Sequence, residues 1–495
     1  MDILYRSTRG VAGEYTASMA IIKGLCEDGG LFVPDKFPKL NVSIDELAGL
    51  DYKQTAYIVM NEFLTDYTED ELKGCINAAY DEKFDTEEIA PLVKKGNQYF
   101  LELFHGKTIA FKDMALSILP HLLTTAMKKN NVNKEVVILT ATSGDTGKAA
   151  LAGFSDVAGT KIIVFYPKGG VSRIQELQMV TEKGKNTKVI GVNGNFDDCQ
   201  SGVKAIFGNT KLTEEMASKG YQFSSANSIN IGRLVPQVAY YVYAYGRMVK
   251  SGAIKSGDLL NFVVPTGNFG NILAAFYAKQ MGLPVGKLIC ASNENKVLFD
   301  FFESGTYDKN REFILTSSPS MDILISSNLE RLIYLLCGND ANKNKALMEQ
   351  LKDDGKYSID DSMRAMLKDF TGFYAGEEEV FNTIRTIYDS TGYVIDTHTA
   401  VAATAEGEYA SQSQDSNKSV IVSTASPYKF TRNVLKAIGV GDDKTDDFEL
   451  VDKLEDISKV KIPNAVEEIR EAKILHSTVC NVEDMEKQVR EYLAL

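Results

Sequence analysis

The chain has 495 residues, enough for two to four domains with large hydrophobic cores. Its net charge of −13 argues against a nucleic-acid partner, because a phosphate backbone binds a basic surface, and the lack of any long apolar run argues against a membrane span. The six cysteines and four histidines lack the spacing of metal ligands, so we predict no metal site and expect reduced thiols in a cytoplasmic protein.

The first 90 residues show helical patterns. Apolar residues recur three and four positions apart in segments 44–50, 52–65 and 69–80. None of these segments carries an obvious cluster of reactive side chains. We therefore predict a helix-rich N-terminal domain over residues 1–90.

From about residue 97, short apolar runs alternate with longer helical patterns. The predicted strands are 136–141, 161–166, 188–192, 260–264, 288–291 and 420–424. The predicted helices are 148–154, 174–181, 196–208, 236–251, 272–281 and 427–437. Such alternation is typical of an α/β protein whose parallel sheets are covered by helices on both faces and whose ligands bind at the carboxyl ends of the strands. The polar pattern of residues 300–390 predicts a helical excursion on the surface.

One lysine, Lys112, stands in an apolar and aromatic run between Phe111 and Met114. Burial lowers the pKa of such an amine and leaves it free to form a Schiff base. The alternative is a lysine at the start of a helix that reaches solvent or pairs with Asp113. The local sequence does not choose between the two.

A glycine-rich loop, residues 263–271, joins a predicted strand to a predicted helix. Gly267 and Gly270 allow close backbone approach, and the N–H groups of a helix N-terminus suit a phosphate. A plain strand-to-helix turn is the alternative. The pattern Gly-x-Gly-x-x-Gly is absent, so the loop is not a dinucleotide fingerprint.

Residues 140–149 resemble a nucleotide-binding P-loop only in part. Thr142 stands where the first glycine is required, and Ala149 stands where the closing serine or threonine is required. What remains is a hydroxyl-rich loop that could hold a carboxylate or a second phosphate. An ordinary capped helix fits equally well.

Two further polar segments could contact a ligand. Residues 224–233 combine amides and hydroxyls with Arg233, which suits an anionic substrate, although a polar surface turn has equal weight. Residues 420–430 place Thr424 after a buried strand, where its hydroxyl could bond a heterocyclic nitrogen. Ser426 is adequately explained as a cap before a proline.

In this order, the motifs make the chain resemble the threonine synthase family, in its longer form with an additional N-terminal domain. The resembling segments are 8–10, 28–34, 101–106, 110–113, 140–147, 195–200, 225–230, 264–270, 321–323, 327–331 and 423–430. The family belongs to the fold-type II pyridoxal-phosphate enzymes. The resemblance therefore implies two lobes with parallel-rich twisted sheets flanked by helices. The large lobe would comprise about 91–130 and 250–495, and a smaller mobile lobe about 131–249.

The resemblance also implies roles for individual residues. Lys112 would be the catalytic residue and would bind pyridoxal 5'-phosphate covalently. The other cofactor-binding residues would be Gly267, Asn268, Phe269, Gly270, Asn271 and, at the ring nitrogen, Thr424. The substrate-binding residues would be Thr142, Ser143, Asp145, Thr146, Asn230 and Arg233, the last two at the substrate phosphate.

Four positions depart from the usual pattern of the family. Lys107 and Thr397 stand where proline is common, Asn271 where a related acid is common, and Ser426 where histidine is common. Lys107 and Asn271 each make the local charge more positive by one unit, which could suit a phosphate-bearing substrate.

The implied reaction is the last step of threonine biosynthesis. O-phospho-L-homoserine and water would give L-threonine and phosphate, by γ-elimination followed by β-addition of water. The alternative is a phosphohomoserine or phosphothreonine lyase of the same fold, which would release 2-oxobutyrate. The resemblance implies a monomer whose partner is a small molecule.

Overall fold

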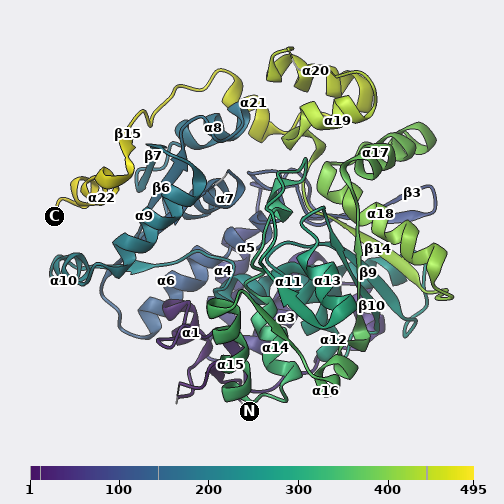
Figure 1. Cartoon of the computed structure of the whole chain (residues 1–495), viewed down its shortest axis with the longest axis horizontal. Helices are drawn as coiled ribbons and strands as arrows, with labels where there is room; N and C mark the ends of the chain where they lie inside the picture. Colours follow the sequence, from purple (N-terminus) through teal and green to yellow (C-terminus); the bar gives the residue numbers. More distant parts are fainter. Residues whose placement is uncertain (1, 12, 143, 442–443) are drawn as a thin grey trace.

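The computed structural model describes residues 2–11, 13–142, 144–441 and 444–495, and it shows an α/β protein built on two parallel-rich sheets (Figure 1). The larger sheet has the order β13-β10-β9-β14-β4-β3, and only its β3–β4 pair is antiparallel. Its strands are β3 (Leu92–Lys95), β4 (Gln98–Glu102), β9 (Leu260–Pro265), β10 (Val285–Ser292), β13 (Phe370–Tyr374) and β14 (Lys418–Ser423).

The smaller sheet is parallel throughout and has the order β15-β7-β6-β5-β8. Its strands are β5 (Glu135–Ala141), β6 (Thr160–Pro167), β7 (Thr187–Asn193), β8 (Tyr221–Ser224) and β15 (Val479–Asn481). Figure 1 shows β15, β7 and β6 on one side of the molecule and β9, β10 and β14 on the other. The six strands predicted from apolar runs are all present, because runs rich in branched residues suit strands that are buried on both faces.

Helices cover the sheets. In the larger sheet, α18 (Thr397–Gln412) packs on β9, β10 and β14, and α12 (Gly270–Gln280) packs on β9 and β10. In the smaller sheet, α7 (Asp145–Phe154) packs on β6, and α9 (Phe196–Gly208) packs on β5 and β6. The remaining helices of this region are α5 (Asp113–Leu116), α6 (Leu119–Lys129), α8 (Arg173–Val180), α10 (Thr210–Ser218) and α11 (Ile231–Lys250).

The N-terminal region contains the three predicted helices, α2 (Ile44–Leu47), α3 (Tyr52–Phe63) and α4 (Glu69–Ala79). Each begins at a capping box, in which Ser43, Asp51 or Thr68 accepts a bond from a backbone N–H of the first turn. The region also holds α1 (Ala17–Lys23), β1 (Tyr5–Ser7) and β2 (Phe32–Pro34). Because α3 packs along α11, one hydrophobic core continues from the N-terminal region to the smaller sheet.

Residues 300–390 are only partly the helical excursion that we predicted. The region contains the helices α13 (beginning before it, Val297–Ser304), α14 (Leu329–Leu336), α15 (Ala341–Asp353), α16 (Asp361–Ala365) and α17 (Glu377–Thr391). It also contains β11 (Thr306–Asp308), β12 (Lys356–Ser358) and β13, which pairs with β10 and extends the larger sheet. The prediction missed β13 because five residues with a central glycine carry little strand signal.

The C-terminal residues return to the smaller sheet. Strand β15 pairs with β7, and α22 (Met485–Leu493) packs on α9, so this sheet extends beyond the predicted range 131–249. The other C-terminal helices are α19 (Thr431–Ala437), α20 (Asp447–Ser458) and α21 (Asn464–Arg470). Short 3₁₀ turns are η1 (Pro319–Met321), η2 (Met366–Asp369), η3 (Pro427–Lys429) and η4 (Val482–Asp484). None of the helices in the described ranges combines the length and the apolar character needed to cross a bilayer.

Candidate active site

Lys112 lies beside the loop that follows β14. It directly precedes α5, and the segment before it is bound to the loop that follows β14. Phe111 donates its backbone N–H to the Thr424 carbonyl at 2.8 Å, and Ser426 donates to the Ile109 carbonyl at 3.0 Å. These bonds hold Lys112 at the carboxyl end of the larger sheet, which is where ligands bind in such folds.

The Lys112 amine is enclosed by polar groups from distant segments. Its Nζ lies 3.2 Å from the Ser320 hydroxyl and 3.4 Å from Oδ2 of Asp145. The side chain is 13% exposed, and burial lowers its pKa, with the positive charges of Lys429 and Arg233 acting in the same direction and Asp145 opposing them. A lowered pKa leaves more of the amine neutral and nucleophilic. The contacts thus support the interpretation of Lys112 as a reactive amine, since its salt-bridge partner is Asp145 and not Asp113.

The glycine-rich loop lies against the segment that carries Ser320. A Cβ atom on Gly267 would come within 2.8 Å of the Ser320 carbonyl oxygen, so the close approach requires glycine. Phe269 has a φ of 64° and opens α12, which leaves the first N–H groups of that helix at the loop. Asn328 donates its backbone N–H and its side-chain amide to the Asn268 carbonyl, which fixes the loop.

Two buried donors near the loop have atoms without a partner among the described residues. The Nδ2 atom of Asn271 is one, although its Oδ1 accepts bonds from the hydroxyls of Tyr240 (2.5 Å) and Tyr241 (2.6 Å). The Nε atom of Arg233 is the other, and burial lowers the pKa of this guanidinium to about 10. Buried donors left unpaired cost free energy, so both indicate places for acceptor groups of a ligand.

The hydroxyl-rich loop brings Asp145 to Lys112, while Thr142 acts within the loop. The Thr142 hydroxyl accepts the backbone N–H groups of Gly144 and Gly147, both at 2.9 Å. Thr146 is half-buried in the first turn of α7. Ser143, which we predicted to bind substrate, lies outside the described residues.

Four other residues that the sequence singled out form hydrogen bonds within the protein. Asn230 caps α11 through Gly232 and donates to the Ile21 carbonyl, so both ends of its amide are bonded within the protein. Ser426 caps η3, as the sequence predicted. Thr397 donates its hydroxyl to the carbonyl of Ser317 at 2.7 Å. Thr424 is buried, and its bond to Phe111 is made by its backbone.

The sequence did not single out Ser320 or Lys429, and of the histidines, which include His398, it predicted only that they bind no metal. His398 is buried, its Nδ1 lies 2.8 Å from Asp396, and its Nε2 accepts the backbone N–H of Ser320. The Nζ of Lys429 lies 3.1 Å from Oδ1 of Asp145. A signal for Lys429 was present, because it sits between Tyr428 and Phe430 after a strand, as Lys112 sits in its own aromatic run.

Three family models match the chain. They are "Threonine synthase N terminus" over residues 4–80, "Pyridoxal-phosphate dependent enzyme" over 91–427 and "Threonine synthase, C-terminal" over 399–491. A threonine synthase of Saccharomyces cerevisiae is 37% identical over 88% of this chain and 89% of its own length. The chain belongs to the threonine synthase family. The resemblance stated from the motifs and the fold-type II α/β class are thereby confirmed.

Solved structures agree with this family membership. A pyridoxal-phosphate-bound threonine synthase from Brucella melitensis has a TM-score of 0.89 and 32% identity, covering 100% of both chains. The yeast threonine synthase structure has a TM-score of 0.88 and 34% identity, covering 99% of both chains. The human protein named threonine synthase-like 1 is 40% identical over 86% of this chain, which spans only 58% of that relative's length.

Pyridoxal phosphate is the cofactor of this threonine synthase family member, and the side chains present fit it. The lowered pKa of Lys112 suits a covalent bond to the cofactor aldehyde. The N-terminus of α12, the close glycine approach and the unpaired Nδ2 of Asn271 suit a phosphate. In the described part of the chain, no group of three or more His, Cys, Asp or Glu side chains could hold a metal ion.

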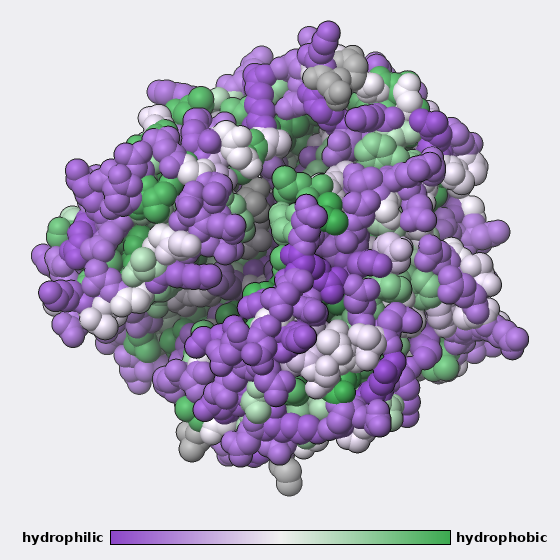
Figure 2. Space-filling model, viewed as in Figure 1, coloured by the Kyte–Doolittle hydropathy of each residue, from purple (hydrophilic) through white to green (hydrophobic). Residues whose placement is uncertain are grey.

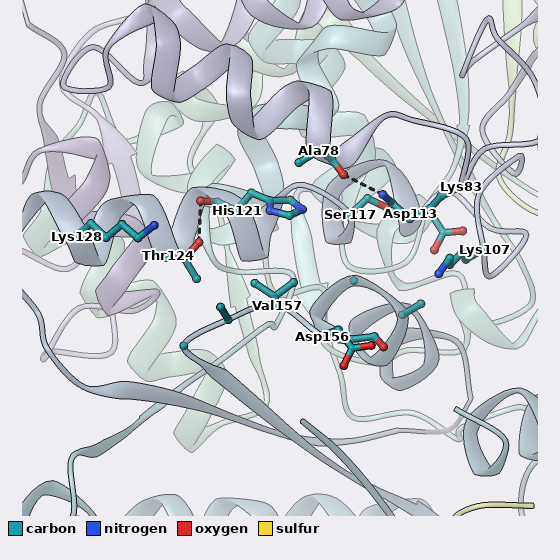
Figure 3. Close-up of a pocket in the computed structure, with 15 residues that line it drawn as sticks. Ala78, Lys83, Lys107, Asp113, Ser117, His121, Thr124, Lys128, Asp156 and Val157 are labelled. Atoms are coloured by element: carbon teal, nitrogen blue, oxygen red, sulfur yellow. Dashed lines mark hydrogen bonds between the residues drawn. The ribbon is translucent and has the colours of Figure 1, made fainter. Parts of the chain in front are cut away.

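The threonine synthase fold also contains a cavity of about 660 Å³ next to this site (Figure 3). It lies between the N-terminal region, α6 and the turn after α7, and its lining includes His121, Asp156 and Val157. Lys107 is exposed at this cavity and forms no hydrogen bond with Lys112, both of which the structure describes. The departure from the family pattern at Lys107 is therefore placed at the cavity rather than among the groups around the Lys112 amine.

Proposed function

We propose that this protein is a threonine synthase that converts O-phospho-L-homoserine and water to L-threonine and phosphate. The observation that carries the proposal is a buried amine of lowered pKa, Lys112, accompanied by two separate buried nitrogen atoms, Nδ2 of Asn271 and Nε of Arg233, that have no partner among the described residues. Two donor sets suit two phosphates, one on the cofactor and one on the substrate.

Among the residues, we assign the cofactor phosphate to the Gly267–Asn271 loop and the substrate phosphate to Arg233. The charge of Arg233 acts on Lys112, so the substrate anion would lie near the reacting amine. The family resemblance implies that Asn230 acts together with Arg233, and Asn230 supports this proposal by capping the helix that carries Arg233. Thr424 offers a neutral hydroxyl for the ring nitrogen, which would leave that nitrogen without a fixed proton.

Lys112 would both hold the cofactor covalently and act as the general base. Pyridoxal phosphate supplies, when bound, an electron sink for the electrons left behind when an amino acid loses its Cα proton. The neutral Lys112 amine would accept that proton and return protons at later steps. Ser320 and Asp145 lie within hydrogen-bond distance of its Nζ and would keep the amine oriented.

The test is product identification with purified protein, cofactor and phosphohomoserine. We expect threonine and phosphate in equal amounts, and no turnover by Lys112→Ala. Release of 2-oxobutyrate without threonine would instead assign the lyase alternative. Borohydride reduction followed by peptide mass spectrometry should place the cofactor on Lys112.

We also propose that the protein works as a monomer in the cytoplasm. All six cysteines are free thiols, and five of them are buried, which is typical of proteins from a reducing compartment. Light scattering on the holoenzyme should give a mass near 54.5 kDa, and a dimer mass would reject the monomer.

A further inference from the structure

The Asp145 carboxylate joins the two sheets at the active site. Asp145 begins α7, which packs on the smaller sheet, whereas its partners Lys112, Ser320 and Lys429 follow or neighbour strands of the larger sheet. Oδ2 accepts the Ser320 hydroxyl at 2.7 Å and lies 3.4 Å from the Lys112 amine. Oδ1 lies 3.1 Å from the Lys429 amine and accepts the Gln175 amide at 3.1 Å. Each carboxylate oxygen thus has its own set of donors.

Lys429 is held rigidly on the larger-sheet side of this junction. Its side chain is 1% exposed, and its Nζ donates to the Thr108 carbonyl at 2.8 Å in addition to its contact with Asp145. A buried ammonium is stable only with such compensation. Because Nζ also bonds the backbone carbonyl of Thr108, close to Lys112, the positive charge of Lys429 is held in place beside Asp145.

We propose that Lys429 is a positioning residue for Lys112, whose ammonium fixes one oxygen of Asp145 so that the other oxygen faces Lys112 and Ser320. The inference rests on the proposed function and adds the residue that orients its base. Lys429 has no need to touch substrate in this role.

The role has an electrostatic consequence that simple packing would not have. The charged groups acting on Lys112 are Asp145 from α7, Lys429 from η3 and Arg233 from α11. The Lys429 charge lowers the pKa of Lys112, whereas Asp145 raises it. Removal of Lys429 should therefore raise the pKa of Lys112 and convert more of the base to its protonated form.

The test measures the pKa of Lys112 in the full-length protein freed of cofactor. The pH dependence of Lys112 acetylation by acetic anhydride would be read by peptide mass spectrometry, with the exposed Lys204 of α9 as internal reference. We expect Lys429→Met to raise the pKa of Lys112 by about one unit, since a nearby like charge is lost. An unchanged pKa would overturn the proposal.

Matched variants separate charge from packing. Lys429→Arg keeps the positive charge and should keep the pKa of Lys112 low. Lys148→Met removes another largely buried lysine, from the same helix as Asp145, whose partner is Glu182 at 3.1 Å. This control should leave the pKa of Lys112 unchanged, and an equal rise in it would overturn the specific role of Lys429.

A second variant covers the case in which Lys429→Met does not fold. Asp145→Asn preserves shape and removes the negative charge, so the pKa of Lys112 should fall below the wild-type value. A pKa that did not fall would overturn the proposal. These acetylation results hold whether or not the protein makes threonine, so failure of the proposed function would be recognised separately.

Kinetics of the holoenzyme distinguish positioning from substrate binding. Lys429→Met should lower kcat with phosphohomoserine by about tenfold, as expected when a rise of about one unit in its pKa leaves less of a general base in the neutral form, while KM stays within about twofold. A raised KM with unchanged kcat would assign Lys429 to substrate binding and overturn the proposal.

Discussion

Two buried arginines at the starts of two helices differ in how fully they are bonded. Arg331, near the start of α14, donates Nε to the Phe32 carbonyl at 2.9 Å, one terminal nitrogen to Asn328 and the other to the Ile229 carbonyl at 2.5 Å. Arg233, near the start of α11, donates a terminal nitrogen to the Ala226 carbonyl at 2.9 Å, and its buried Nε has no partner among the described residues.

This difference in hydrogen bonding indicates that Arg331 supports the fold, whereas Arg233 is available to bind a ligand. Burial lowers the pKa of both guanidinium groups, but Arg331 also has Tyr277 and Glu330 nearby, which oppose the shift. For Arg233, burial lowers the pKa, and the guanidinium forms no salt bridge with a carboxylate among the described residues. A buried charge without a partner is unstable unless a ligand completes it, and a phosphate fits a guanidinium well.

The largest expected effect comes from Arg233→Met. We expect kcat/KM with phosphohomoserine to fall about 1,000-fold, because charge-assisted bonds to the substrate phosphate are lost. The urea midpoint of the cofactor-free protein should be unchanged or higher, since the variant removes an uncompensated buried charge. Unchanged kinetics of Arg233→Met would contradict the proposal that Arg233, unlike Arg331, binds the substrate.

The matched variant Arg331→Met should act on stability. It leaves three acceptors in the interior without their donor, so we expect the free energy of unfolding to fall by about 3 kcal/mol in urea denaturation. Arg331 links the N-terminal region to the loop before α11, so the loss should also loosen that junction. A stable variant with lost activity would make Arg331 a binding residue as well.

Much of the site could be predicted from sequence because its signals are local. Lys112 within an aromatic run and the glycine loop between a strand and a helix each occupy about ten consecutive residues. The alternating strands and helices were also predictable, since their hydrophobic periods are local. The resemblance implied that Asn230 binds the substrate phosphate, whereas its bonds to Gly232 and Ile21 give it a capping role that residue type alone does not reveal.

The remaining features depend on contacts between distant segments. Ser320 reaches Asp145 across 175 positions, and the Thr108 contact of Lys429 spans 321. Strands β13 and β15 are short and join sheets whose other strands are far away in the chain. Neither composition nor periodicity carries such information.

His105 is a histidine that, like Arg331, has a partner for each of its side-chain nitrogens. Its ring nitrogens lie 2.6 Å from Asp85 and 2.9 Å from Glu102, which raise its pKa to about 9 against the effect of burial. The pKa is raised above the ordinary value near 6.5, so the stabilisation is fully present below pH 6.5 and is lost as pH rises through about 9. Wild type should exceed His105→Gln by about 2 kcal/mol in unfolding free energy at pH 6 and by little at pH 10. A difference independent of pH would show that packing, not charge, is responsible.

The smallest effect concerns Asn271, which is bonded at one end of its amide only. Asn271→Asp keeps an oxygen for the Tyr240 and Tyr241 hydroxyls but replaces the unpaired Nδ2 with a second oxygen. If Nδ2 faces the cofactor phosphate, a carboxylate there would repel it, and we expect cofactor affinity to fall about tenfold in an absorbance titration of the cofactor-free protein. The control Tyr241→Phe leaves Nδ2 in place and should bind the cofactor within about twofold of wild type. Equal affinity of wild type and Asn271→Asp would mean that an unpaired buried donor is not sufficient to mark a phosphate site in this protein, and the assignment of Arg233 would then depend on its charge alone.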